Sequence, residues 1–153
     1  IGHLQTNKVK QVVPLVHMIH SVDSVRLLET INREAEKIGR HVKVLLEVHV
    51  AKEESKSGFT PEEFLSLASN LSHNNLYPWV KVCGVMGMAT NTDDKDEWRR
   101  CFREIKYLAS KLSTLNTKQI SMGMSDDYLV AIEEGSTMVR IGSTIFGVRA
   151  SKV

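Results

Sequence analysis

Short apolar runs alternate with amphipathic stretches along most of the chain. The apolar runs predict five strands, over residues 15–22, 42–50, 80–88, 118–122 and 138–141. The amphipathic stretches predict helices over residues 24–39, 60 to about 71, 93 to about 115 and 126–134, after a first helix over about 5–13. Thr60-Pro61-Glu62-Glu63 places an N-cap, a proline and an acidic residue at one helix start, which is the signature of a capping box.

Strands that are apolar on both faces and alternate with helices indicate an α/β fold with a parallel sheet. Two architectures fit this order, an open doubly wound sheet and a (β/α)8 TIM-type barrel. A Gly-x-Gly-x-x-Gly fingerprint after a strand is absent, which favours the barrel. A complete barrel usually needs about 250 residues. We therefore expect residues 1–153 to form one domain that runs from the end of the third barrel strand to the eighth, with Ile1-Gly2 as a strand stub.

The composition narrows the class of protein. Hydrophobic residues make up 42% of the chain, charged residues 25%, and the net charge is +2 without any run of Lys or Arg. We therefore expect neither a nucleic-acid partner nor a membrane partner. Cys83 and Cys101 lie in an apolar strand and a helix, which does not resemble a disulfide framework or a cysteine metal site. No signal peptide is recognisable, so we expect a cytoplasmic protein.

Two corners of small residues follow the last two predicted strands. The first is Gly123-Met124-Ser125 and the second is Gly142-Ser143. In barrels, the loops after strands seven and eight often bind phosphate through backbone N–H groups and a helix N-terminus. Ser125 could equally be the N-cap of the helix predicted over 126–134, and both interpretations stay open. We expect Asp126 and Asp127 to point outward, because a carboxylate facing the corner would repel an anion.

Other candidate residues also allow two interpretations. Arg140 stands in an otherwise apolar strand, so it either meets a ligand in the barrel centre or pairs with Glu47 or Glu133. Lys56 lies on a loop at the C-terminal end of a strand, where it is either a solvated lysine beside acids or a donor to an anion. His17, His20 and His49 are expected to be satisfied core or edge side chains, since His17 and His20 cannot share one strand face.

Six motifs, spread from one end of the chain to the other, identify a family. They are IGHLQTNK at 1–8, HSVD at 20–23, SKSG at 55–58, GVMGMA at 84–89, SMGMSDD at 121–127 and GSTMVRIGSTIFG at 135–147. Together they resemble the pyridoxal phosphate homeostasis protein family. The resemblance implies a barrel like the N-terminal domain of alanine racemase. It also implies that the protein binds pyridoxal 5′-phosphate (PLP) and carries or buffers it for PLP-dependent apoenzymes, without established catalysis.

The resemblance also assigns roles to individual residues. Ser125 and the Gly142-Ser143 corner would hold the phosphate, with Gly123 and Met124 in the adjoining turn. Arg140 would face the pyridine nitrogen, which would keep that nitrogen unprotonated and weaken the electron sink on which most PLP enzymes depend. Lys56 would stand near the mouth of the cofactor site, with Glu53 beside it.

One departure from the family concerns the Schiff-base lysine. In the family it lies on the first barrel strand, and this chain has no counterpart of it. We therefore expect a chain truncated at its N-terminus, without covalent cofactor attachment, whose exposed core strands favour self-association. The alternatives are a PLP-dependent racemase-like enzyme, a barrel enzyme acting on a phosphorylated metabolite, and a fragment whose partner supplies the remaining strands.

Overall fold

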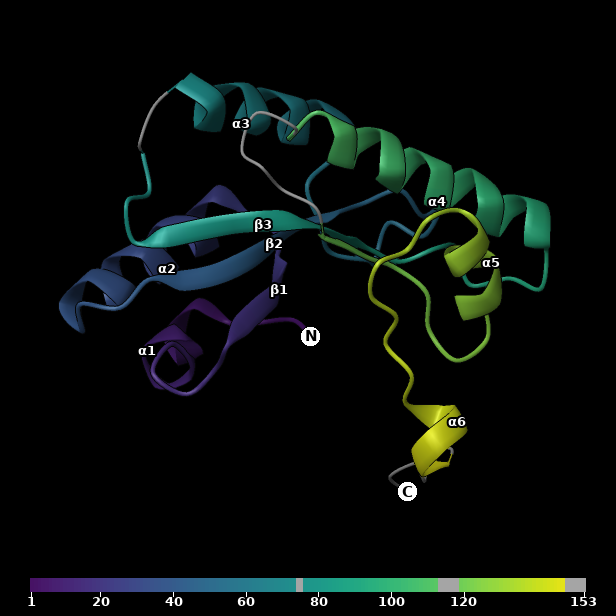
Figure 1. The fold of residues 1–153 in the computed structure, drawn as a ribbon, viewed down its shortest axis with the longest axis horizontal. Helices are drawn as coiled ribbons and strands as arrows, with labels where there is room; N and C mark the ends of the chain where they lie inside the picture. The colour runs from purple at the N-terminus through teal and green to yellow at the C-terminus, as the bar shows by residue number, and fades with distance from the viewer. Residues whose placement is uncertain (74–75, 113–118, 148–153) are drawn as a thin grey trace.

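A sheet of four parallel strands forms the centre of the protein. The computed structural model describes residues 1–73, 76–112 and 119–147. The strands are β1 (Met18–Val22), β2 (Val42–Val48), β3 (Val80–Gly87) and β4 (Gln119–Ser121), and their spatial order follows their order in the chain (Figure 1). A helix connects each strand to the next, as parallel pairing requires. The four strands confirm the α/β prediction, and each lies within the range expected from the sequence.

Three long helices connect the strands, and shorter helical segments lie near both ends of the chain. The connecting helices are α2 (Val25–Lys37), α3 (Pro61–His73) and α4 (Lys95–Ser110). The shorter segments are η1 (Thr6–Lys8), α1 (Val9–Val12), α5 (Tyr128–Glu133) and α6 (Ser143–Phe146). Helix α6 follows an extended segment that carries it away from the sheet (Figure 1). Residues 113–115 of the predicted long helix lie outside the described residues.

Local signals explain where the long helices begin. The Ser24 hydroxyl accepts a hydrogen bond from the Leu27 N–H at the start of α2. At the start of α3, the Thr60 N–H donates to Glu63 Oε2 and the Glu63 N–H donates to Thr60 Oγ1. This reciprocal pair is the capping box predicted from the sequence, and it satisfies two backbone donors that a helix start would otherwise leave unpaired.

The two faces of the sheet differ in what they contact. Val44, Leu46 and Val48 alternate along β2 and join the buried cluster that includes Phe102 and Ile105 of α4. Leu45 and Glu47 alternate with those residues, are also buried, and point to the opposite, inner face. The helices therefore cover the outer face, and the inner face mixes apolar with ionisable side chains.

The sheet is strongly curled. His20 Nδ1 of β1 lies 3.3 Å from Ser121 Oγ of β4, although these are the first and last strands of the sheet. Three strand spacings of about 4.8 Å would separate β1 from β4 by about 14 Å in a flat sheet. Side chains of the two strands meet only because the inner face closes on itself. The curl confirms the barrel-type prediction over an open sheet.

The predicted fifth strand is only partly formed. Residues 138–141 run extended beside β4, where a single bridge joins Ser121 to Met138 and the Arg140 N–H donates to the Gly123 carbonyl at 2.9 Å. A regular ladder does not form because β4 is three residues long and turns away at Gly123. The Ile1-Gly2 stub is likewise extended without strand pairing. The Ser21 hydroxyl donates to the Gly2 carbonyl and holds it beside the end of β1.

Candidate functional site

The two small-residue corners lie side by side at the C-terminal edge of the sheet. Ser125 Oγ accepts hydrogen bonds from the backbone N–H groups of Gly142 and Thr144, each at 3.3 Å. Helix α5 begins at Tyr128, so Asp127 and not Ser125 occupies the N-cap position. The N-cap interpretation of Ser125 is therefore wrong. Its hydroxyl instead joins the turn after β4 to the segment that leads into α6.

The glycines of the two corners have different physical roles. Gly123 has φ +94°, and a Cβ there would lie 2.5 Å from Ala131 Cβ, so the residue lets the turn pack on α5. Gly142 has nothing within 4 Å of the position that a Cβ would take. Packing therefore does not require glycine at 142, and the space in front of its backbone is open. Ser143, the first residue of α6, is exposed beside it.

Asp127 differs from its expected orientation. Its side chain is 9% exposed, and its Oδ1 accepts from the Met124 N–H at 2.6 Å. Burial raises the pKa of Asp127, while the hydrogen bond from Met124 opposes that shift. Asp126 is exposed, as expected from the sequence. The outward prediction is wrong for Asp127, because the tight turn at 123–127 needs a side-chain acceptor for its own backbone.

Neutral hydrogen-bond acceptors hold the Arg140 side chain on the inner face of the sheet, at its C-terminal edge. Its Nη1 donates to the carbonyl and to the hydroxyl of Ser121, both at 2.8 Å, and its Nη2 donates to the Gly87 carbonyl at 3.1 Å. Burial lowers the pKa of Arg140, and Glu47 and Asp127 oppose this shift through their charges. Glu133 instead pairs with Arg99. Among the described residues Arg140 has no ion pair with Glu47 or Glu133.

A cavity of about 340 Å³ opens beside Arg140. His20, Met138, Arg140 and Gly142 contribute to its lining, together with Ile1, Val139 and Ile141. Gly142 belongs both to this cavity and to the Ser125 corner. Arg140 and Gly142, whose N–H donates to Ser125 Oγ, thus line one cavity, which offers a cationic side chain and a backbone donor to an anionic heterocycle.

Lys56 lies in a neighbouring cavity and not in the one beside Arg140. Its Nζ donates to the Ala89 carbonyl at 2.7 Å and pairs with Glu53 Oε1 at 2.8 Å. The second cavity has a volume of about 280 Å³ and is also lined by Met124 and Asp127. Lys56 is therefore tethered and partly buried. It is not among the residues that line the Arg140 cavity.

Sequence reasoning missed His20 as a member of the site. It lines the Arg140 cavity, is 9% exposed, and has Nδ1 within 3.3 Å of Ser121 Oγ. Its contact with Ser121 bridges 101 positions of the chain, so no local pattern could reveal it. His17 lies at the opposite end of β1 beside Lys43, and His49 contacts the Glu53 carbonyl.

Glu47 is a buried carboxyl group on the same inner face. It is 3% exposed, and burial, followed by the charge of Asp23, raises its pKa to about 7. The charges of Arg140 and His3 oppose that shift. Glu47 therefore changes charge near neutral pH and alters the field around the guanidinium.

The raised pKa of Glu47 predicts a pH-dependent stability. Between about pH 4.5 and pH 7 the folded protein keeps a proton that the unfolded chain has lost, so the free energy of unfolding falls as the pH rises through this range. The fall attributable to Glu47 is roughly 3 kcal/mol. Urea unfolding at several pH values measures it. Glu47→Gln should flatten the slope between these values, and an unchanged slope would contradict the account.

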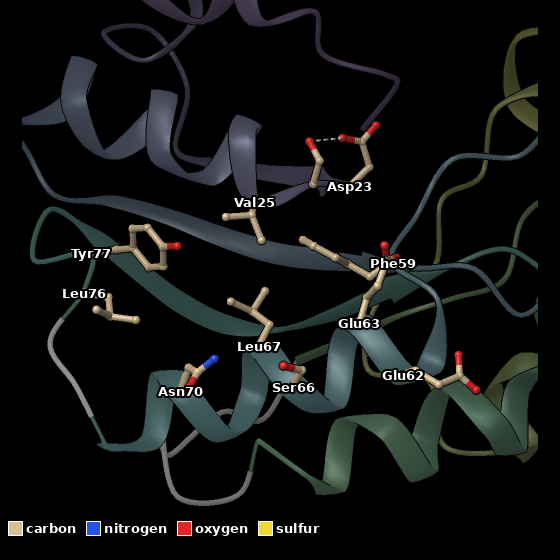
Figure 2. A pocket seen from close by; sticks show the side chains of 11 residues that line it. Asp23, Val25, Phe59, Glu62, Glu63, Ser66, Leu67, Asn70, Leu76 and Tyr77 are labelled. Atoms are coloured by element: carbon tan, nitrogen blue, oxygen red, sulfur yellow. Dashed lines mark hydrogen bonds between the residues drawn. The ribbon is translucent and has the colours of Figure 1, made fainter.

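A larger cavity, of about 640 Å³, lies on the outer side of the sheet between α2 and α3. Figure 2 shows its apolar floor, which includes Phe59 and Leu67. Among the described residues, those that line it include Asp23, Glu62 and Glu63 but no Lys or Arg. The charged side chains that a phosphorylated ligand would meet there are therefore carboxylates. This groove is therefore unsuited to a phosphate, and the Arg140 cavity is the candidate site.

Comparisons with known proteins show which family this chain resembles. Residues 1–150 match the family described as alanine racemase, N-terminal domain. A pyridoxal phosphate homeostasis protein of Aquifex aeolicus is 40% identical over 152 residues, which are 97% of this chain and 65% of that protein. The corresponding protein of Synechocystis is 37% identical, covering 97% of this chain and 68% of that one. The chain thus spans about two thirds of the length of these relatives.

Solved structures show the same fold. The structure of PipY from Synechococcus elongatus with PLP bound matches with a TM-score of 0.85 and 32% identity, over 96% of this chain and 68% of that one. An alanine racemase of Clostridium difficile matches with a TM-score of 0.72 at 15% identity, over 99% of this chain and 39% of that one, which shows the barrel fold alone. The chain belongs to the alanine racemase N-terminal domain family, among the pyridoxal phosphate homeostasis proteins.

Proposed function

We propose that this chain binds PLP in the Arg140 cavity and serves intracellular PLP homeostasis as a carrier or buffer. One observation carries the proposal. One cavity is lined by both Arg140 and Gly142, and the Gly142 N–H donates to Ser125 Oγ. Relatives that are 33–40% identical bear the name pyridoxal phosphate homeostasis protein, and the similar PipY structure is described with PLP bound.

The phosphate would lie at the Ser125 corner. The N–H groups of Gly142 and Thr144 already converge on one hydroxyl oxygen, so they could also donate to a phosphate oxygen. The open space at Gly142 leaves room for the anion, and Ser143 would add its hydroxyl. Gly123 and Met124 would shape the turn below. These contacts fit the phosphate group.

The pyridine nitrogen would face Arg140. A guanidinium only donates hydrogen bonds, so it is complementary to a ring nitrogen that carries a lone pair and no proton. PLP supplies an aldehyde and an electron-accepting ring when it is bound, and a protonated ring nitrogen strengthens that electron sink. Arg140 disfavours this protonation, which supports binding and transfer of the cofactor over catalysis.

The described lysines do not supply a covalent anchor at this site. In the described part of the chain, no lysine lines the Arg140 cavity, and Lys56 is tethered to Ala89 and Glu53 in the cavity next to it. We therefore propose reversible, non-covalent binding by this chain, with Lys56 near the mouth. PLP-dependent apoenzymes would be the recipients, and the exposed Phe146 of α6 (86% exposed) supports self-association.

Ser125→Ala is expected to weaken PLP binding about tenfold, because a hydrogen bond to a charged phosphate oxygen is lost. Equilibrium dialysis with PLP measures the change, and pyridoxal, which lacks the phosphate, should bind both forms equally weakly. Ser110→Ala on α4 is the matched control, since Ser110 Oγ donates to the Tyr107 carbonyl and Ser110 does not line the Arg140 cavity. Equal PLP affinity of wild type and Ser125→Ala would refute the phosphate assignment.

A further inference from the structure

His20, Ser121 and Arg140 form a buried chain of hydrogen bonds that crosses the inner face of the sheet. Arg140 Nη1 lies 2.8 Å from Ser121 Oγ, and His20 Nδ1 lies 3.3 Å from the same oxygen. Ser121 is fully buried, so water cannot replace either contact at its hydroxyl. The three residues come from β1, β4 and the extended segment beside β4.

Donor and acceptor capacities fix the direction of the Arg140–Ser121 hydrogen bond and favour one direction for the contact between Ser121 and His20. A guanidinium has five N–H donors and no acceptor, so the Ser121 oxygen must accept from Arg140. The single hydroxyl hydrogen of Ser121 then remains to be donated, and Nδ1 of His20 is the acceptor within reach. The arrangement that uses the Ser121 hydroxyl hydrogen therefore leaves a lone pair on His20 Nδ1 and places the ring proton on Nε2.

From this geometry, and resting on the proposed PLP site, we infer that neutral His20 is a positioning residue: it aims the Arg140 guanidinium at the ligand through the Ser121 hydroxyl and releases it when His20 becomes protonated. The Nδ1 lone pair orients the hydroxyl hydrogen of Ser121 away from Arg140. The oxygen lone pairs of Ser121 then face Nη1, and the guanidinium keeps one orientation at the edge of the cavity.

Protonation of His20 would break this arrangement. An N–H on Nδ1 would point at the Ser121 oxygen and leave the hydroxyl hydrogen without an acceptor in a fully buried position. Two cationic groups would then share one neutral oxygen. Burial lowers the pKa of His20, followed by the positive charges of the N-terminal amino group and Arg140, so the neutral form prevails at physiological pH.

Other ionisable groups act on the same inner face. Those whose charges influence His20, Arg140 or Glu47 are Glu47 on β2, Asp23 after β1, His3 and the amino group of the N-terminal segment, and Asp127 before α5. Glu47 titrates near pH 7, above the lowered pKa of His20. A variant that removes only the titration of His20 is therefore needed to assign the pH dependence of PLP binding to this residue.

Two substitutions of His20 distinguish a role in positioning Arg140 from a role in packing alone. The Oδ1 atom of His20→Asn can accept the Ser121 hydrogen bond at any pH, whereas His20→Leu removes the acceptor. We expect His20→Asn to bind PLP within about twofold of wild type at pH 8, and His20→Leu to bind roughly fivefold more weakly. As the pH falls below the ordinary pKa of histidine, wild type should lose affinity more steeply than His20→Asn. The PLP phosphate titrates identically in both, so the difference between their pH profiles isolates His20.

A spectroscopic measurement tests the hydrogen bonds between His20, Ser121 and Arg140 in the absence of PLP. In histidine-labelled protein, heteronuclear NMR should find His20 with its proton on Nε2 and with a pKa below the ordinary value. A proton on Nδ1, or a His20→Leu variant that binds PLP as wild type does at every pH, would overturn the inference. Absence of PLP binding by wild type would instead defeat the proposed function, while the NMR result would still decide the hydrogen-bond chain.

Discussion

Arg140→Gln is expected to lower the affinity for PLP by roughly 10- to 100-fold, because hydrogen bonds from a charged donor contribute about 1.5–3 kcal/mol. Glutamine is shorter, neutral and has one amino group. It cannot reach both the Ser121 and Gly87 acceptors, which lie on β4 and β3. Arg140→Lys should bind PLP little better than Arg140→Gln does, since an ammonium group lacks the planar fork that spans the two carbonyls.

Equilibrium dialysis with PLP measures the loss, and urea unfolding shows whether the variant remains folded. Arg103→Gln is the matched control. Arg103 is an exposed arginine on α4 that pairs with Glu134, on the outer side of the molecule. If a folded Arg140→Gln protein bound PLP as tightly as wild type, Arg140 would not contact the ligand and the site assignment would be wrong.

Gly84→Ala is expected to give the largest loss of stability. Gly84 has φ +154° and pairs with Gln119 of β4, and an added Cβ would lie 1.8 Å from the Gln119 carbonyl oxygen. The obstacle is backbone, so no side-chain rotation can relieve it. We expect a loss of about 4 kcal/mol or more, which is a large part of the 5–15 kcal/mol stability of an ordinary domain.

Urea unfolding followed by circular dichroism measures this loss. Gly142→Ala makes the same chemical change where nothing lies within 4 Å of the new Cβ, so its free energy of unfolding should match wild type. Its PLP affinity should nevertheless fall, because the methyl group would occupy the space assigned to the phosphate. A stable Gly84→Ala protein would show that β3 and β4 are less closely apposed than the structure indicates.

The link between Gly84 and the site is direct. Close pairing of β3 and β4 places the Gly87 and Ser121 carbonyls where one guanidinium reaches both. Separation of the two strands would therefore also release Arg140. Stability of this part of the sheet and geometry of the candidate site depend on the same backbone contact.

Much of the fold was predictable because its signals are local. Apolar runs marked β1 to β4, and Thr60-Pro61 with Glu63 marked the start of α3. Parallel pairing followed from strands that are buried on both faces. The strand predicted at 138–141 was overestimated, because its apolar pattern does not show the length of the neighbouring strand that it can pair with.

The site was harder to predict because its contacts join distant parts of the chain. Sequence left Ser125 open between a helix cap and a phosphate ligand, since it shows the helix that follows and not the Gly142 and Thr144 N–H groups 17 and 19 positions away. The buried position of Asp127 depends on the backbone of a tight turn. His20 was expected to be a satisfied core or edge side chain and not a site residue, because its partner Ser121 is brought to it only by the curl of the sheet.

A crystal structure of this chain grown with PLP tests the central claim most directly. We predict density for one PLP molecule, with its phosphate within hydrogen-bonding distance of Ser125 Oγ and the Gly142 N–H and its ring nitrogen facing Arg140. PLP seated in the acidic groove between α2 and α3, or found only on surface lysines while the Arg140 cavity remains empty, would contradict the account.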